Sequence, residues 1–320
     1  MKIDSVCVLG GTGFVGYSLV ARLSKAGVHV RVLTRRRERH RQLLVLPQVE
    51  VVEADVHDPE TLKRQFSGRD GVINLIGILN ERGHNGAGFR HVHVDLAKKV
   101  LTAAKHCGVG RILQMSALGA DQGGPSHYLR TKGEAENHLH TFGQPGIAVT
   151  SFRPSVIFGP GDGLFNRFAT LLRYSPILPL ACPDARFIPV YVGDVADRMA
   201  DALTDRDTFG QRYDLCGPEQ MTLLEIVHYV QELKDLRRWV LPLPDWAARL
   251  QANVLEFVPG KPFSRDNYAS LKHKAACSGE PCPTTVAAVV PHYLGQHHRQ
   301  QRLQALRREA GRNVPPAPAT

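Results

Sequence analysis

The first 115 residues alternate between short apolar runs and longer segments with apolar residues at helical spacing. The apolar runs predict strands at residues 6–9, 29–33, 48–54, 71–79 and 111–115. Helical spacing predicts helices between them, including residues 17–26 and 92–107. Asn74, a polar residue within the fourth run, either satisfies a local backbone group or lines a ligand cleft. Strands that alternate with helices form βαβ units, so we predict an α/β fold of the Rossmann type, a doubly wound parallel sheet.

The C-terminal half of the chain predicts shorter and less regular elements. Its patterns indicate strands at residues 147–153, 187–192 and 212–216, and helices at 165–174 and 223–233. We expect a Rossmann domain that binds the dinucleotide at residues 1–178 and a smaller α/β lobe at 179–296. The lobe covers the cleft and returns strands to the main sheet. A basic tail at 297–320 is expected to be poorly ordered.

Two C-terminal segments bear on membrane contact. Prolines frame a helix with Trp246, Leu250 and Val254 on one stripe, and we expect this stripe in the core rather than at a membrane. Leu303 and Leu306 give the basic tail a faint amphipathic pattern, which leaves peripheral membrane contact open. The sequence contains no signal peptide and no apolar run of membrane-spanning length, which predicts a cytoplasmic protein whose membrane contact would be at the inner face.

The positive charge of the chain is concentrated in two short segments. The formal net charge is +10, and residues 35–41 and 297–320 each carry five arginines and one glutamate, which is +4 in each. This distribution forms no basic stripe along a groove, and no nucleic-acid-binding motif accompanies it. We therefore predict no nucleic-acid partner.

The cysteine pattern predicts thiols rather than disulfides or metal ligands. The chain has six scattered cysteines: Cys7, Cys107, Cys182, Cys216, Cys277 and Cys282. Several lie in apolar or strand-like runs, which suits reduced core thiols better than a disulfide framework. Cys277 and Cys282 are close in sequence, but no further Cys or His pair with zinc spacing completes a metal site.

The candidate chemistry begins in the turn after the first strand, in the sequence GGTGFVG at residues 10–16. Glycines at these positions let the backbone turn sharply and approach a pyrophosphate, and Gly16 lets the next helix pack close to the strand. A glycine-rich hairpin turn is the alternative. A strand before the motif and a helix after it favour a dinucleotide site, with the phosphates at the helix N-terminus.

The end of the second strand predicts which dinucleotide binds. NAD-binding chains usually have an acidic residue there, about 20 residues past the glycines, which holds the ribose 2′-hydroxyl. This chain has Thr34 followed by three arginines. Guanidinium groups bind a phosphate in a forked geometry, so we predict NADP(H) in preference to NAD(H), with Arg35 and Arg36 as contacts. The alternative is a basic turn that is only solvated.

A second candidate constellation follows the fifth strand. Tyr128 and Lys132 are four residues apart at the start of a predicted helix, so both project from one face. A nearby ammonium lowers the pKa of a phenol, which lets the tyrosine transfer a proton at neutral pH while the lysine holds the nicotinamide ribose. Ser116, at the end of the fifth strand, would hold the substrate oxygen. Ser126 is a rival for that role, but it lies in the loop before the helix.

These residues resemble the short-chain dehydrogenase/reductase superfamily, in its extended or atypical branch. Within it, the chain is similar to the Rossmann-fold accessory subunit of respiratory complex I and its bacterial relatives. The similar stretches are NLIGILNE (74–81), MSALG (115–119), YLRTKGE (128–134), RPSVIFGP (153–160), FNRF (165–168) and PVYVGDVA (189–196). Together they cover roughly residues 3–295.

The resemblance places Ser116, Tyr128 and Lys132 at the catalytic positions of the superfamily. The expected cofactor contacts are Gly10, Thr12, Gly13, Phe14, Val15, Gly16, Arg35, Arg36, Asp55, Val56, Ile76, Gly77, Tyr128, Lys132, Arg153, Pro154 and Ser155. Two departures matter. His93 stands where many extended members have Asn before the fifth strand, which weakens the case for a working proton relay. The basic tip of the second strand argues against a sugar-nucleotide epimerase that retains NAD.

Two function classes follow from the sequence, with an epimerase or dehydratase as a third. The first is an NADP(H)-dependent oxidoreductase that acts on an unidentified carbonyl or alcohol, plausibly lipid- or quinone-like. The second is a non-catalytic NADP(H)-binding protein of the complex I accessory type, with a protein partner. The sequence identifies neither the substrate nor the partner.

Overall fold

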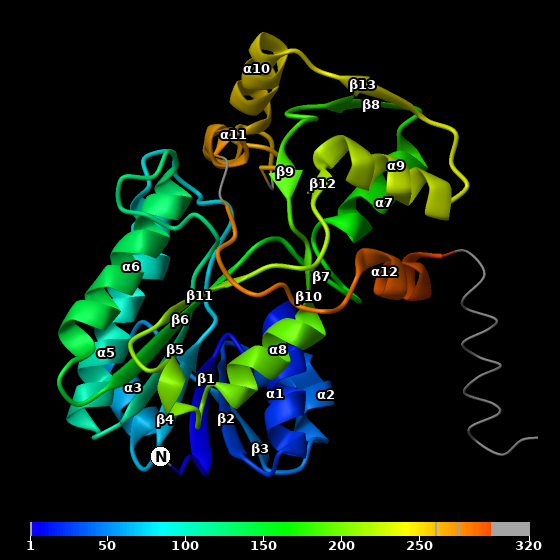
Figure 1. The fold of residues 1–320 in the computed structure, drawn as a ribbon. Helices are drawn as coiled ribbons and strands as arrows, with labels where there is room; N and C mark the ends of the chain where they lie inside the picture. The colour runs from blue at the N-terminus through cyan, green and yellow to red at the C-terminus, as the bar shows by residue number, and fades with distance from the viewer. Residues whose placement is uncertain (1, 260, 274–275, 296–320) are drawn as a thin grey trace, which may run out of the picture.

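A seven-stranded parallel sheet forms the centre of the molecule, in the order β11-β6-β5-β4-β1-β2-β3 (Figure 1). The computed structural model describes residues 2–259, 261–273 and 276–295, so the predicted tail lies outside the described residues. The strands of the sheet are β1 (Ser5–Leu9), β2 (His29–Thr34), β3 (Val49–Glu53), β4 (Gly71–Asn74), β5 (Arg111–Met115), β6 (Ala148–Pro154) and β11 (Arg212–Leu215). This arrangement confirms the predicted Rossmann-type α/β fold.

Helices cover both faces of the sheet, because its central strands carry apolar side chains on both faces. On one face lie α1 (Phe14–Lys25), α2 (Arg41–Leu44) and α8 (Val192–Asp201), and on the other lie α3 (Pro59–Phe66), α5 (Leu96–His106) and α6 (His127–Gly143) (Figure 1). A 3₁₀ turn, η1 (Arg37–His40), precedes α2, whereas α4 (Ala87–Phe89) and the π-helical η2 (Arg90–Asp95) precede α5. Val8 of β1 is paired with Val32 of β2 and Ile73 of β4 at the centre of the sheet.

Local signals at two element ends have different outcomes. At the start of α3 the Asp58 side chain caps the helix, since its carboxylate accepts hydrogen bonds from the backbone N–H groups of Glu60 and Thr61. The predicted fourth strand is too long, because β4 ends at Asn74. There the Asn74 side chain accepts a hydrogen bond from the N–H of Ile76 and donates one to Gln114, so it satisfies a local backbone group as the chain leaves the sheet.

A smaller lobe lies beyond the carboxyl end of the sheet (Figure 1). Its elements are β7 (Ile157–Phe158), α7 (Phe165–Tyr174), β8 (Ile177–Leu180), β9 (Arg186–Phe187), β10 (Val190–Tyr191), β12 (Met221–Thr222), α9 (Leu223–Leu233), β13 (Trp239–Pro242), α10 (Asp245–Leu255), α11 (Arg265–Lys272) and α12 (Val286–Leu294). Between these elements the chain returns to the sheet through α8, the 3₁₀ turn η3 (Arg206–Thr208) and β11. The boundary at residue 178 stays a prediction.

Two predictions for the lobe are wrong. The strand predicted at residues 187–192 is divided into β9 and β10, and Val192 already begins α8. The stripe of Trp246, Leu250 and Val254 is exposed rather than in the core. The reason is that α10 packs inward through Ala248 and Ala252, whose small side chains allow a close approach.

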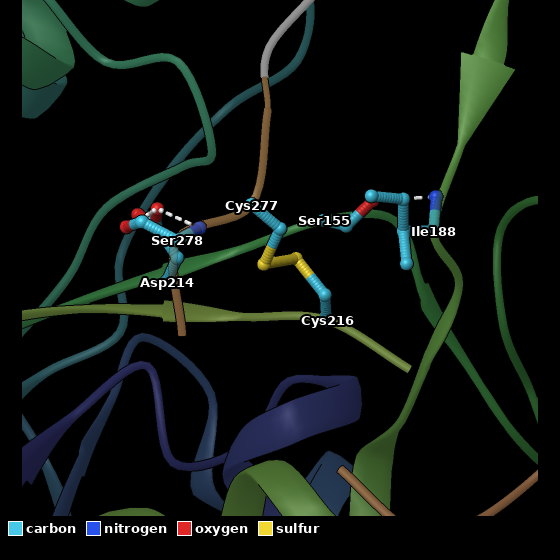
Figure 2. Close-up of a disulfide and its surroundings, with 6 residues drawn as sticks. All are labelled: Ser155, Ile188, Asp214, Cys216, Cys277 and Ser278. Carbon is cyan, nitrogen blue, oxygen red and sulfur yellow. Dashed lines mark hydrogen bonds between the residues drawn. A yellow bond between two sulfur atoms is a disulfide. The ribbon is translucent and has the colours of Figure 1, made fainter. Parts of the chain in front are cut away.

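The prediction that all cysteines are reduced is also wrong, because Cys216 and Cys277 form a disulfide (Figure 2). The two residues are 61 positions apart, so their sequence spacing gives no sign of the pairing. They meet because the chain after α11 crosses the end of β11, where Ser278 donates hydrogen bonds to the Asp214 carboxylate (Figure 2). The other four cysteines are free thiols, as predicted.

Candidate functional site

The glycine-rich turn joins β1 to α1 with its backbone drawn close to the helix. Gly10 has a φ of +78°, and its carbonyl accepts a hydrogen bond from Gly13 N–H at 3.0 Å. A Cβ atom on Gly16 would lie 2.3 Å from the Gly10 carbonyl oxygen, so only glycine fits there. The helix starts at Phe14, earlier than predicted, and Gly13 provides no side-chain cap. The first-turn N–H groups, including those of Phe14 and Val15, therefore lack intrahelical acceptors and suit an anion.

The tips of β2 and β3 present charge beside this turn. Thr34 is buried, whereas Arg35 and Arg36 are exposed and form no ion pair with any described residue. Arg35 also lies close enough to His57 to contribute to the lowered pKa of that imidazole, after the larger effect of burial. Asp55 is exposed and its carboxylate accepts a hydrogen bond from His57 N–H, and Val56 beside it packs on the core.

The predicted catalytic residues lie at the end of β5 and in the first turns of α6. Ser116 is buried, and its Oγ has no hydrogen-bond partner among the described residues. The Lys132 ammonium is buried and donates to the carbonyl of Met115 at 3.1 Å. A Cβ atom on Gly77 would lie 3.0 Å from Lys132 Nζ, so this glycine leaves room for the ammonium. The half-buried Tyr128 lies one helical turn before Lys132.

The electrostatics of this group differ from the prediction for the phenol. Burial lowers the pKa of Lys132 to about 8, with a smaller opposing effect from Glu136. Burial, followed by the negative charge of Asp266, raises the pKa of Tyr128 to about 12. In the protein alone, the Lys132 ammonium therefore does not lower the pKa of the phenol, because desolvation of a phenolate is the larger effect.

His93, at the position where many superfamily members have Asn, is part of the same cluster. It lies in the π-helical segment η2, and its ring is 5.6 Å from the Tyr128 ring, centroid to centroid. Its Nε2 accepts a hydrogen bond from Ile78 N–H, and its Nδ1 lies 2.9 Å from Thr131 Oγ1. Burial, with a smaller effect of Lys132, lowers the pKa of His93 to about 2, so the imidazole is neutral and holds the loop after β4.

Asp266 of the small lobe is a site residue that the sequence analysis missed. Its carboxylate accepts hydrogen bonds from the backbone N–H groups of His127 and Tyr128, at 2.6 and 3.2 Å. It thus caps the N-terminus of α6 from α11, a contact across 138 residues. Ser126 is the N-cap of α6, and its Oγ accepts a hydrogen bond from Leu129 N–H. Of the two candidate serines, Ser116 is therefore the one whose hydroxyl has no partner among the described residues.

Polar side chains at the end of β6 and just after it have partners within the protein. The Arg153 guanidinium forms a forked ion pair with the fully buried Glu136 of α6. Ser155 Oγ accepts a hydrogen bond from Ile188 N–H of the small lobe (Figure 2). The cofactor contacts expected of residues 153–155 stay a prediction.

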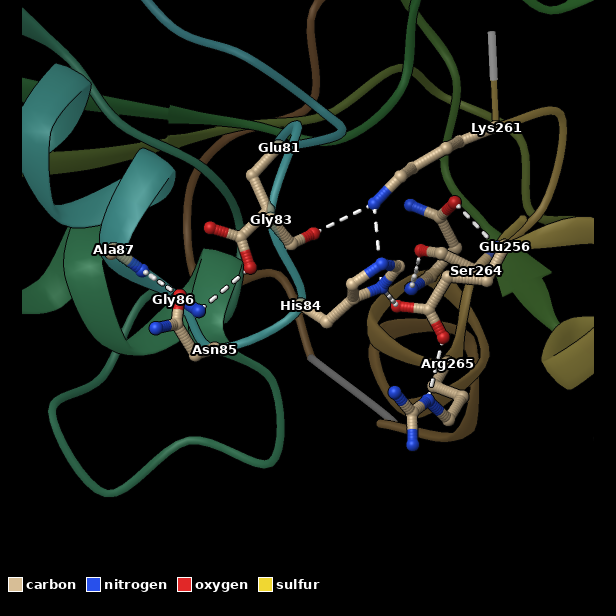
Figure 3. A network of polar contacts seen from close by, with 11 residues as sticks. Glu81, Gly83, His84, Asn85, Gly86, Ala87, Glu256, Lys261, Ser264 and Arg265 are labelled. Atoms are coloured by element: carbon tan, nitrogen blue, oxygen red, sulfur yellow. Dashed lines mark hydrogen bonds and ion pairs between the residues drawn. The ribbon is translucent and has the colours of Figure 1, made fainter. Parts of the chain in front are cut away.

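A cavity of about 290 Å³ lies beside the start of α6, between the loop after β4 and the segment that joins α10 to α11. Figure 3 shows the polar network that fastens the two sides of this cavity together. His84 Nδ1 lies 2.9 Å from the Glu256 carboxylate, which also accepts from Arg265, and Lys261 donates to the carbonyl of Gly83. The loop and the small lobe are therefore held together next to the catalytic cluster.

Three observations indicate that a dinucleotide fits at this edge of the sheet. The glycine turn has no room for side chains at Gly16, the first turn of α1 has no side-chain cap, and Ser116 Oγ is buried without a hydrogen-bond partner in the part of the chain that the structure describes. Within the described ranges, no group of three His, Cys, Asp or Glu side chains is arranged to hold a metal ion. Every helix in those ranges is too short or too polar to span a bilayer.

Comparison with known proteins assigns the family. A family model described as NAD(P)H-binding matches residues 10–160, which contain the glycine turn, Ser116, Tyr128 and Lys132. NADH dehydrogenase (ubiquinone) 1 alpha subcomplex subunit 9 of mouse mitochondria is 30% identical over 272 residues, which are 83% of this chain and 71% of that protein. The chain belongs to this subunit 9 family.

The chain is also similar to a reductase and to an epimerase. Ceramide reductase of Caulobacter vibrioides is 33% identical to this chain over 198 residues, 61% of the chain and 59% of that protein. UDP-glucose 4-epimerase of Thermus thermophilus, solved with NAD, is 25% identical with a TM-score of 0.65, covering 75% of this chain and 86% of the epimerase. The chain spans 64% and 66% of the length of two further subunit 9 relatives.

Proposed function

We propose that this protein binds NADP(H) in preference to NAD(H) at the carboxyl edge of its sheet. The observation that carries the preference is the tip of β2, where Arg35 and Arg36 are exposed and unpaired among the described residues. Thr34 takes the place of the acidic residue that usually stands at the end of this strand and would repel a 2′-phosphate. The predicted contacts from Gly10, Thr12, Asp55 and Ile76 belong to this proposal.

Titration calorimetry with NADPH and NADH tests the preference. We expect the double variant Arg35→Ala and Arg36→Ala to lose most of its NADPH affinity and little of its NADH affinity. The matched control is Arg39→Ala with Arg41→Ala, which removes the same charge from the same basic segment. Equal affinities of the wild type for the two nucleotides would overturn the proposal.

The function that the catalytic cluster supports is an NADP(H)-dependent oxidoreductase acting on a carbonyl or an alcohol. The bound nicotinamide donates or accepts the hydride. Ser116 Oγ holds the substrate oxygen, Tyr128 Oη exchanges a proton with it, and the Lys132 ammonium holds the nicotinamide ribose. The unpaired hydroxyl of Ser116 supports this assignment, because a buried hydroxyl is ordinarily hydrogen-bonded.

The substrate class that we propose is lipid- or quinone-like. The relative from Caulobacter vibrioides is named as a ceramide reductase, which supports a substrate with lipid chains. The relatives named as subunits of NADH dehydrogenase (ubiquinone) support a protein partner as well. We propose further that the protein works in the cytoplasm, with peripheral contact at the inner face of the membrane.

A non-catalytic NADP(H)-binding protein is the second candidate, and one observation favours it. The Tyr128 pKa is raised to about 12 rather than lowered, so the phenol of the protein alone is poorly suited to exchange a proton at neutral pH. The subunit 9 family membership agrees with such an accessory role.

Following NADPH absorbance with a panel of long-chain ketones and quinones separates the two candidates. The oxidoreductase predicts turnover that Tyr128→Phe abolishes while most of the NADPH affinity remains. Tight NADPH binding without turnover by either protein would leave the accessory function. NAD that co-purifies with the protein would instead favour an epimerase.

A further inference from the structure

The larger apolar side chains of α10 are exposed to solvent, and its small ones face the protein interior. Its inward face consists of alanines, with Ala248 and Ala252 each 1% exposed. Its outward face has Trp246, Leu250 and Val254 at i, i+4 and i+8, and the first two are 71% and 56% exposed. An amphipathic helix normally buries its larger apolar residues, so this outward stripe lacks a partner within the described chain.

The neighbouring two-stranded sheet continues the same surface. Ile177 of β8 is paired with Trp239 of β13, and both are exposed, as is Leu241 two residues further on. The alternate residues Leu178 and Val240 face the core of the lobe. α10 lies against this sheet, since Gln251 Nε2 donates to the carbonyl of Pro179.

We call these exposed residues the apolar crown: Ile177, Trp239, Leu241, Trp246, Leu250 and Val254. Figure 1 shows its three elements, α10, β13 and β8, together at the end of the small lobe that is farthest from the central sheet. A set of exposed large apolar residues at one end of a protein marks a site of contact with a protein or a membrane.

We propose that the apolar crown docks on the surface of an anionic phospholipid membrane. The two tryptophans suit the interface between headgroups and acyl chains, where an indole has one apolar and one hydrogen-bonding edge. Arg237 and Arg249 lie two or three residues from them, in position to meet lipid phosphates. The carboxylate of Asp245, the residue before Trp246, forms ion pairs with Arg249 and Lys272.

Charge and strand chemistry disfavour a second copy of this chain as the occupant. Two chains of net charge +10 repel each other, whereas an anionic bilayer attracts one. Addition of a strand from another copy is also disfavoured, because Pro179 and Pro242 remove N–H donors from β8 and β13. The docking surface is separate from the catalytic cluster, so this proposal goes beyond NADP(H) binding and does not depend on it.

The chain provides its own reporter for the experiment. Trp239 and Trp246 are its only tryptophans, and both belong to the apolar crown. The vesicles contain phosphatidylcholine and phosphatidylglycerol, with about one quarter anionic lipid. We expect them to shift the tryptophan emission of the full-length protein to shorter wavelength. Vesicles of phosphatidylcholine alone should shift it less. An unchanged emission spectrum with the anionic vesicles would overturn the proposal.

Matched variants test the position of the surface by vesicle flotation. Leu250→Glu should lower the partition coefficient by about tenfold or more, because it removes apolar area and adds a negative charge. Phe142→Glu makes the same change in charge at an exposed apolar residue of α6, outside the apolar crown, and should bind nearly as wild type. Circular dichroism verifies that both variants fold.

Two outcomes of this comparison contradict membrane docking. If both variants float with the wild type, the crown is not the contact surface. If light scattering shows a wild-type dimer that Leu250→Glu dissociates while vesicles bind neither form, the occupant is a second copy of the chain.

Discussion

The helices α6 and α10 differ in which side they bury, although each has apolar residues at helical spacing. α6 packs beside α5 on one face of the sheet and buries Leu139 completely. α10 contacts α11 and β8 and has solvent on its outer side, where Leu250 is exposed. An apolar stripe therefore predicts burial only where a second layer of structure covers it, and neither helix contains that information in its own sequence.

Identical leucine truncations in the two helices give the largest expected contrast. Leu139→Ala leaves a cavity in the core and should lower the free energy of unfolding by about 3 kcal/mol. Leu250→Ala removes an exposed side chain and should change it by less than about 0.5 kcal/mol. Urea denaturation measures both, and similar losses for the two variants would mean that α10 is covered in the folded protein.

A methyl group at the glycine turn should have the next largest effect. The new Cβ in Gly16→Ala would lie 2.3 Å from the Gly10 carbonyl oxygen, so α1 must shift and the free energy of unfolding should fall by about 2 kcal/mol. NADPH affinity should fall with it. Gly163→Ala has open space around its Cβ and is the control. Thermal unfolding with and without NADPH measures both effects, and unaltered NADPH stabilisation of Gly16→Ala would contradict the proposed phosphate site.

The buried ammonium of Lys132 predicts that the free energy of unfolding depends on pH. Its folded pKa of about 8 is below the ordinary 10.5, so the unfolded chain binds the extra proton between these values. Stability therefore rises with pH from about 8 to 10.5, and the full penalty for the ammonium is present below pH 8. Lys132→Met should stabilise the protein at pH 7 by roughly 1–3 kcal/mol and remove this rise. Urea midpoints measured across this pH range test it, and the same rise in the variant would assign it to other groups.

The smallest expected effect concerns the contact between α6 and α11 of the small lobe. Asp266→Asn removes a charge from the N-terminus of α6, so the free energy of unfolding should fall by about 1 kcal/mol and the pKa of Tyr128 should fall toward its ordinary value. Absorbance titration of the phenols measures the pKa change. The double variant with Tyr128→Phe is the control, since the difference between the titration curves should vanish when the reporting phenol is absent.

Much of the sheet and of the cofactor site could be predicted from the sequence. β5 and α7 have the predicted ends, because the apolar pattern that sets them depends on residues close together in the chain. The glycine turn and the cluster of Ser116 and Lys132 follow from the same local order. The length of the fourth strand was not predictable, because an apolar run continues after the chain has left the sheet at Asn74.

Contacts between distant segments account for most of what the sequence analysis missed. The cap that Asp266 supplies to α6 and the pairing of His84 with Glu256 each join residues more than a hundred positions apart. Capping signals were visible in the sequence, since Ser264 and Asn267 form a capping box for α11. That signal predicts the start of a helix but not which other element the helix touches.

The sequence by itself determined the alternation of strands and helices, the glycine turn and the basic tip of β2, because periodicity and backbone freedom are local properties. The tertiary structure alone decided that Cys216 meets Cys277, that the Tyr128 phenol is desolvated, and that α10 turns its tryptophan outward. Each of these depends on which surfaces the folded chain brings together or leaves uncovered, and desolvation and apolar contact act only between surfaces that meet.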